Sequence, residues 1–144
     1  MTVSVGIALN AMQVQVVWPE VQLLVEEHGA DWLEIVDLRD VYIQVLDGKL
    51  DLWLANERLE LLGVLFCSWE RHAKRSFYHL NYGCGKELQS FMKEGLKKIE
   101  GYAALSGASE VVLGGRLGWE RMLTRLGYAQ KFVELRKSVR NYLQ

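Results

Sequence analysis

The chain has 144 residues, of which 50% are hydrophobic and 24% charged, and its formal net charge is −1. This length suits one domain whose core is large enough to need no metal or disulfide. The balanced charge lacks the basic excess of a dedicated nucleic-acid binder, and no apolar run approaches the ~20 residues of a membrane span.

The chain contains one proline, Pro19, and no low-complexity stretch, so we expect residues 1–144 to form a single domain. Its two cysteines, Cys67 and Cys84, form no CxxC pair, and the three histidines do not complete a zinc spacing with them. We therefore expect two free thiols in a reducing compartment. No basic-then-apolar leader opens the sequence, which predicts a cytoplasmic protein.

The first third of the chain predicts one strand and two helices. Val3–Leu9 is β-branched and apolar, as a strand would be, whereas 11–18 suits either a strand or a helix. Pro19 suits the first position of a helix that ends at Gly29. A second helix is expected from Leu33 to Leu46, before the Asp-Gly turn signal.

Three strands joined by short polar turns follow, which favours antiparallel pairing. We expect them at Leu50–Ala55, Leu61–Trp69 and Ser76–Tyr82. Simple alternation along the third strand divides its residues between two faces. One face would hold Phe77, His79 and Asn81, and the other Tyr78, Leu80 and Tyr82.

The second half of the chain changes character after the glycines at 83 and 85, which are expected to end the third strand. Its predicted elements are a long helix Lys86–Leu105, a strand Val111–Leu113, a short helix Leu117–Leu126 and a last strand Tyr128–Leu135. The strand–helix–strand unit across the long helix should be a right-handed parallel crossover. The predicted fold class is α/β (α+β), with antiparallel strands first and a parallel pair around the crossover helix.

The segment 81–86, Asn-Tyr-Gly-Cys-Gly-Lys, places two glycines between a strand and a helix. Unpaired amides at a helix start form an anion site suited to a pyrophosphate, and Lys86 would add a positive charge. The alternative is that the glycines only make the turn. The segment does not match a P-loop, which needs a longer loop ending in Gly-Lys-Ser/Thr.

A second glycine cluster, at 114–120, surrounds Arg116 and Trp119 at the end of a strand. Ligands of open α/β sheets favour the carboxyl ends of parallel strands, and the arginine fork suits an anion. The alternative is that Arg116 pairs with a carboxylate and Trp119 fills the core.

Three titratable residues, Glu70, His72 and His79, lie on or beside the third central strand. Glu70 or His79 would serve as a general base for a reacting amine, directly or through water. The alternative is a solvated charged turn and a hydrogen-bonded histidine. Cys84, at the expected helix start, offers a thiol nucleophile as a minor option.

The order of strand, glycine loop, long helix, strand, short helix ending in Leu-Gly-Tyr, and strand resembles the GNAT family of N-acetyltransferases, best over Leu50–Val139. More narrowly, the Gly-Arg-x-Gly-Trp segment at Gly115–Trp119 resembles that of short GNAT-like proteins encoded by tailed bacteriophages. The resemblance implies a GNAT-like mixed sheet, and acetyl-CoA held where two parallel strands splay apart.

The family's pyrophosphate loop reads Arg/Gln-x-x-Gly-x-Gly/Ala; Gly83 and Gly85 match it, whereas Leu80 stands at the Arg/Gln position. In many members of the family a tyrosine of the following helix protonates the leaving thiolate, and Leu123 stands at that position here. The resemblance therefore implies cofactor-binding residues at both glycine segments and leaves Glu70 and His79 as catalytic candidates. The cofactor-binding expectations are Leu80, Tyr82, Gly83, Cys84, Gly85, Lys86, Arg116 and Trp119.

Two functions stay open at this point. The first is transfer of an acetyl group from acetyl-CoA to an amine acceptor. The second is a catalytically degenerate, phage-encoded GNAT-fold protein that serves in the virion or binds a host protein, for which exposed members of its five tryptophans would suit an interface. Either would act in the cytoplasm, that of the host for a phage protein, with no nucleic-acid or membrane partner expected and an oligomer left open.

Overall fold

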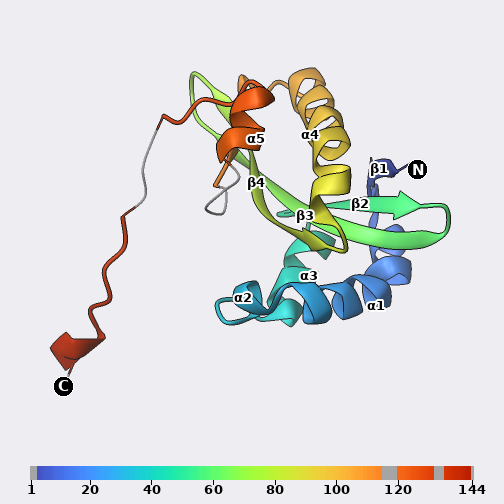
Figure 1. Ribbon diagram of the computed structural model, residues 1–144, viewed down its shortest axis with the longest axis horizontal. Coiled ribbons are helices and arrows are strands. Elements are labelled where there is room, and N and C mark those ends of the chain that lie inside the picture. The colour runs from blue at the N-terminus through green and yellow to red at the C-terminus, as the bar shows by residue number, and fades with distance from the viewer. Residues whose placement is uncertain (1–2, 115–119, 132–134, 144) are drawn as a thin grey trace. The chain divides into compact units, whose positions relative to one another are not determined.

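The computed structural model describes residues 3–114, 120–131 and 135–143 (Figure 1). Its contacts divide the chain into two compact units, Met1–Gly114 and Gly115–Gln144. Each unit is described by itself. In the described part of the chain, no helix has the length and hydropathy needed to cross a bilayer.

The first unit is built on a five-stranded sheet with the strand order β1-β2-β3-β4-β5. Its strands are β1 (Ser4–Ile7), β2 (Asp51–Glu57), β3 (Glu60–Arg71), β4 (Ser76–Gly85) and β5 (Glu110–Leu113). The first four pair antiparallel in sequence order, and β5 pairs parallel with β4. The predicted mixed sheet with one parallel pair is confirmed.

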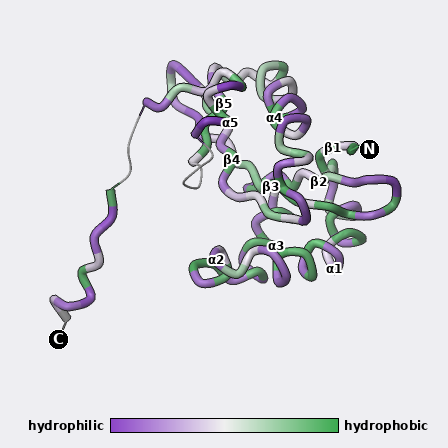
Figure 2. The backbone as a smooth tube through the Cα atoms, viewed as in Figure 1, coloured by the Kyte–Doolittle hydropathy of each residue, from purple (hydrophilic) through white to green (hydrophobic). Residues whose placement is uncertain are grey.

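Helices cover both faces of this sheet (Figure 1). On one face lie α1 (Ala11–His28), α2 (Ala30–Leu33) and α3 (Leu38–Leu46); on the other lies α4 (Leu88–Leu105). Figure 2 shows hydrophobic and hydrophilic residues alternating along α1 and α3, as helices with one buried face require. The core on their side joins Val21 and Val25 of α1 to Phe66 of β3. On the far side, Phe91 of α4 packs against the sheet at Gly63.

The first helix begins earlier than Pro19, so the prediction that Pro19 opens it is wrong. Asn10 caps α1, because its side-chain oxygen accepts the N–H of Gln13 at 2.9 Å. Pro19 lies inside the helix, where it cannot donate to the carbonyl of Gln15. Both residues are exposed, so water can hydrate the carbonyl that is left without a partner.

The helix predicted over Leu33–Leu46 is observed as α3, but it begins at Leu38 and not at Leu33. α2 ends at Leu33, and Asp37 then adopts an extended conformation and accepts the N–H of Arg39 at 2.9 Å. An aspartate in this position caps a new helix rather than continuing an old one. The apolar stripe that suggested one helix includes Val41 and Val45, which are buried residues of α3.

The strand β4 does not end at Tyr82, as its glycines suggested, but pairs with β3 as far as Gly85, opposite Gly63. It also contains a β-bulge, because Tyr82 lies opposite Phe66 while Leu80 lies opposite Cys67. Asn81 is the extra residue of the bulge.

The bulge reverses the sides of the residues that follow it. Tyr78 and Leu80 face α4, whereas Tyr82 and Cys84 face the helices α1–α3. The prediction that Tyr82 shares a face with Tyr78 is therefore wrong. His79 lies opposite Ser68, two residues along β3 from Phe66, and so shares the face of Tyr82.

The second unit contains α5 (Glu120–Arg125) and a 3-10 turn, η1 (Arg140–Leu143). The predicted last strand, Tyr128–Leu135, is not observed in its described residues, 128–131 and Leu135. A strand needs a hydrogen-bonded neighbour, and the described part of this unit holds none.

Candidate functional site

The site begins where β4 separates from β5. The parallel ladder ends at the pair Leu80–Leu113, and β4 then continues through Asn81 to Gly85. Within the described residues, no strand lies beside 81–85 on the side of β5. We call this length of strand, residues 81–85, the β4 fork.

The bulge lies at the first residue of the β4 fork. The side chain of Asn81 donates to Ser68 Oγ at 2.9 Å, while the extra residue of a bulge is unpaired in the strand ladder. A backbone N–H left out of the ladder can stabilise negative charge that develops on a carbonyl oxygen. The bulge was not predicted from the sequence, although asparagine is disfavoured inside a strand and so marks an irregular position.

The start of α4 lies just beyond the fork. Lys86 N–H donates to Leu62 O at 2.8 Å, and Ser90 N–H donates to Glu87 O at 2.8 Å. By helix geometry, the amides of Leu88 and Gln89 have no acceptor within the helix, and the first turn carries no acidic side chain. These two amides and the positive end of the helix dipole can hold a phosphate group.

Lys86 contributes to this end of the site through an exposed ion pair. Its Nζ lies 2.8 Å from Glu60 Oε1, and the two side chains are 46% and 61% exposed. The hydrogen bond that Lys86 donates to Glu60 raises the pKa of Lys86, so the ammonium stays charged. An exposed pair of this kind is weak, so Lys86 can exchange Glu60 for an anionic ligand.

The glycines of the segment have a packing role. A Cβ at Gly83 would lie 2.5 Å from Leu65 Cδ2, and one at Gly85 would lie 2.3 Å from Leu62 O. Gly85 is therefore needed for β4 to approach β3, because its Cβ would meet backbone, whereas at Gly83 the tip of the Leu65 side chain would have to shift. This favours a packing explanation over ligand approach for Gly85, and less strongly for Gly83.

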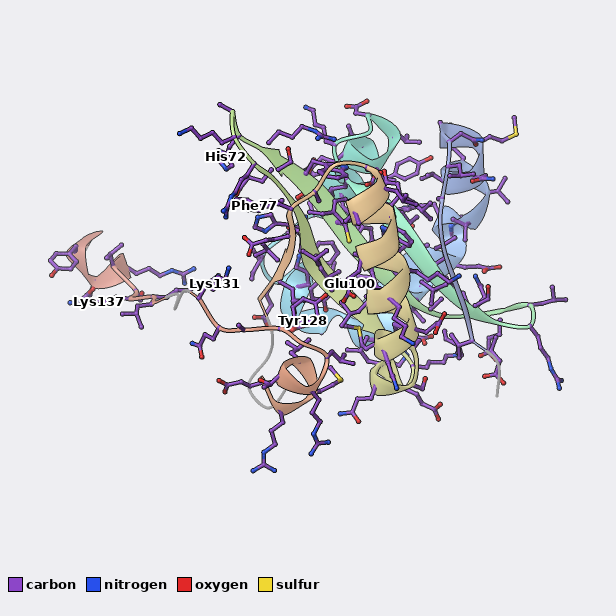
Figure 3. All side chains as sticks on the ribbon, turned by 90° about the horizontal axis from the view of Figure 1, so that it is seen from above. His72, Phe77, Glu100, Tyr128, Lys131 and Lys137 are labelled. Carbon is purple, nitrogen blue, oxygen red and sulfur yellow. The ribbon has the colours of Figure 1, made fainter. Side chains whose placement is uncertain are left out.

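On the face that carries α1–α3, Glu70 lies between two histidines. Its Oε2 is 3.0 Å from His72 Nε2, and its Oε1 is 3.5 Å from His79 Nε2. Figure 3 shows His72 and Phe77 at the end of the sheet where β3 turns into β4. The hydrogen bond from His72 lowers the pKa of Glu70, so its carboxylate stays ionised and can orient an imidazole as proton acceptor.

An aromatic stack lies farther along the same face. The rings of Trp32 and Tyr82 have centroids 4.2 Å apart and planes inclined by 11°. Tyr82 OH donates to Asp31 Oδ1 at 2.9 Å. The ring of Tyr82 thus lies against α2. Sequence reasoning missed Asp31 and Trp32, because their proximity to Tyr82 depends on the bulge.

The remaining predicted residues lie elsewhere. Leu80 is 6% exposed, so its side chain cannot take the place of the family's arginine or glutamine. Cys84 is 1% exposed within β4 and not at the helix start, which removes the geometry assumed for a thiol nucleophile. Arg116 and Trp119 lie outside the described residues.

No protein-family model matches the sequence, and no curated protein matches it. Solved structures match its fold. The aminoglycoside acetyltransferase HMB0005 from an uncultured soil metagenomic sample gives a TM-score of 0.72 at 14% identity, covering 96% of this chain and 99% of that one. The ribosomal-protein-alanine N-acetyltransferase of Brucella melitensis biovar Abortus 2308 gives 0.71 at 12% identity, with 96% and 99% covered.

A third match is the soil metagenomic aminoglycoside acetyltransferase meta-AAC0020 in complex with sisomicin, with a TM-score of 0.69, 10% identity, and 95% and 96% covered. At these identities the likeness concerns the fold. The mixed sheet, its single parallel pair and these neighbours together show that the chain has the fold of the GNAT N-acetyltransferases.

Proposed function

We propose that the chain is a GNAT-type N-acyltransferase that transfers an acetyl group from acetyl-CoA to an amine. The observation that carries this proposal is the bulge at Asn81, which lies at the point where β4 leaves β5. The proposal treats residues 1–144 as one acyltransferase domain acting in the cytoplasm.

Each part of the site has a task in this proposal. Acetyl-CoA supplies an activated thioester when bound. The amides of Leu88 and Gln89, with Lys86, bind phosphate, and the backbone at Asn81 donates a hydrogen bond to the acyl carbonyl. We keep Arg116 and Trp119 as proposed cofactor contacts.

The proton of the acceptor ammonium must leave before the amine can attack. His79, oriented by Glu70 at 3.5 Å, is the proposed acceptor of that proton. In α5, Leu123 offers no acidic hydroxyl. Positioning alone can supply roughly 7–11 kcal/mol of the barrier, so the proposal does not depend on a tyrosine there.

The charge of the chain favours a cationic acceptor. Residues 1–48 contain eight of the 18 acidic and one of the 17 basic residues, whereas 49–144 contain ten acidic and 16 basic residues. The layer α1–α3 belongs to the negative part, and Asp31 lies there beside the Trp32–Tyr82 stack. Negative charge around a site raises the local concentration of cations. Aminoglycosides, the class of ligand in one neighbour, are one group of amines to test.

Titration calorimetry with acetyl-CoA tests the proposal. The wild type should bind at micromolar concentration, and Lys86→Glu should weaken binding about tenfold, a change of ~1.4 kcal/mol. The matched control is Lys98→Glu, an exposed lysine on α4 about 15 Å farther along the helix, which should leave binding unchanged. Absence of binding at millimolar acetyl-CoA, or equal loss in both variants, would refute the proposal.

A second candidate is a catalytically degenerate phage protein that binds a host or virion partner. The buried Leu80 and the leucine at 123 favour it, since both replace residues of the family's motifs. It predicts no binding of acetyl-CoA in the same titration.

A further inference from the structure

A cavity of about 490 Å³ lies at the opposite edge of the sheet from the β4 fork. It is lined by β1, through Ser4, Gly6 and Ile7, by β2, through Leu54 and Asn56, and by α1, through Met12 and Val16. Among the described residues, none that lines it is charged. A neutral, largely apolar groove of this kind suits an apolar partner and offers nothing to select a charged one.

The strand that borders the groove is an unprotected edge. β1 pairs only with β2, so its other side has no strand beside it among the described residues. Its sequence, Ser-Val-Gly-Ile, has neither a charge nor a proline. Exposed edges usually carry such residues because an unblocked edge pairs with another strand.

The helix that borders the groove also exposes apolar side chains that no other described element covers. Met12 and Val16 of α1 are 73% and 77% exposed, and Leu9, just before the cap of the helix, is 76% exposed. The first two turns of α1, Ala-Met-Gln-Val-Gln-Val-Val-Trp at 11–18, contain no charged residue, although the rest of α1 is acidic. A row of exposed apolar side chains on an uncharged helix surface indicates an interface.

We propose that this groove is the interface of a homodimer, in which β1 of one copy pairs antiparallel with β1 of a second copy about a two-fold axis perpendicular to the sheet. Such pairing keeps the same face of both sheets on the same side, so the two α1 helices also meet. The second copy extends the strand layer and covers Met12 and Val16 with its own α1.

A second copy fits better than a foreign extended peptide for a reason of size. The four residues of β1 span only about 14 Å, while a stable interface buries ~800 Å² on each partner. A peptide on β1 would leave the exposed row on α1 open to water. A second copy covers both layers at once, and this inference does not depend on the acyltransferase proposal.

Sedimentation velocity of the full chain from about 1 to about 100 µM tests the dimer. The wild type should be dimeric at the upper end, and Val16→Glu should raise the dimer dissociation constant at least ~100-fold, because two carboxylates would be buried across the two-fold axis. Met12→Lys should act in the same direction.

The matched control is Ile43→Glu, an apolar residue of α3 that is 53% exposed and does not line the groove. It should remain dimeric. Circular dichroism shows whether each variant is folded, and only folded variants are compared. A wild type that is monomeric at every concentration, or Ile43→Glu and Val16→Glu with equal dissociation constants, would overturn the inference.

Discussion

Tyr78 connects the core under α4 to the strand that forms the fork, so its hydroxyl provides a sensitive test of this packing. The hydroxyl donates to Asp51 Oδ2 at 2.5 Å and accepts the indole N–H of Trp53 at 3.0 Å. Tyr78 is fully buried and lies opposite Val111 of β5, two residues before the ladder ends. Tyr78→Phe keeps the ring and removes both hydrogen bonds.

The loss of stability in Tyr78→Phe follows from the two groups that lose their hydrogen-bond partner, the Trp53 N–H and the Asp51 carboxylate. Trp53 is 3% exposed, so its N–H cannot be hydrated, which costs roughly 1–3 kcal/mol, and Asp51 loses a hydrogen bond worth roughly 1 kcal/mol more. The free energy of unfolding should therefore fall by about 2–4 kcal/mol, and the melting temperature by roughly 5–15 °C for a chain of this size.

Urea unfolding of the wild type, Tyr78→Phe and a control measures this difference. Tyr42→Phe is the control, because its ring packs on Trp18 at 4.8 Å in the core on the other face and no hydrogen bond of its hydroxyl is described. It should cost less than about 0.5 kcal/mol. Equal stabilities of the two variants would contradict the account of the Tyr78 network.

Two further predictions concern charge and backbone. Burial raises the pKa of Asp51 against the opposing effect of Tyr78, so ionisation of this carboxyl weakens the fold above its folded pKa. Asp51→Asn should be more stable than the wild type near pH 7, and urea unfolding should show this advantage disappear below about pH 4; an advantage that grows on acidification would contradict the reasoning. Gly101→Ala, in open space on α4, should raise the free energy of unfolding by roughly 0.5–1 kcal/mol. Gly85→Ala, whose Cβ meets backbone, should lower the free energy of unfolding by more than ~1 kcal/mol. If urea unfolding showed that both variants are stabilised, β4 would not approach β3 as described.

Much of the fold could be predicted from the sequence because it depends on periodicity and chain order. The apolar stripe of α4 and the β-branched Val111–Val112 pair predicted the crossover helix and its parallel strand, and both are observed. The proximity of Glu70 and His79 also follows from the short turn that joins two antiparallel strands.

The site's finer geometry could not be predicted, because it depends on contacts between distant residues. The bulge at Asn81 arises from the pairing of β4 with β3, and it decides that Tyr82 meets Trp32. Likewise, the need for glycine at 85 comes from the backbone of Leu62 across the sheet. The sequence of a glycine pair between a strand and a helix is the same whether the glycines allow two strands to pack closely or allow a ligand to approach the backbone.

The central claim is that the β4 fork and the start of α4 receive the acyl donor. Backbone amide NMR of the ¹⁵N-labelled chain during an acetyl-CoA titration tests it most directly. The account predicts saturable shifts at Asn81, Leu88 and Gln89, with the amides of β1 unchanged. Shifts confined to other parts of the chain, or none at millimolar acetyl-CoA, would contradict it.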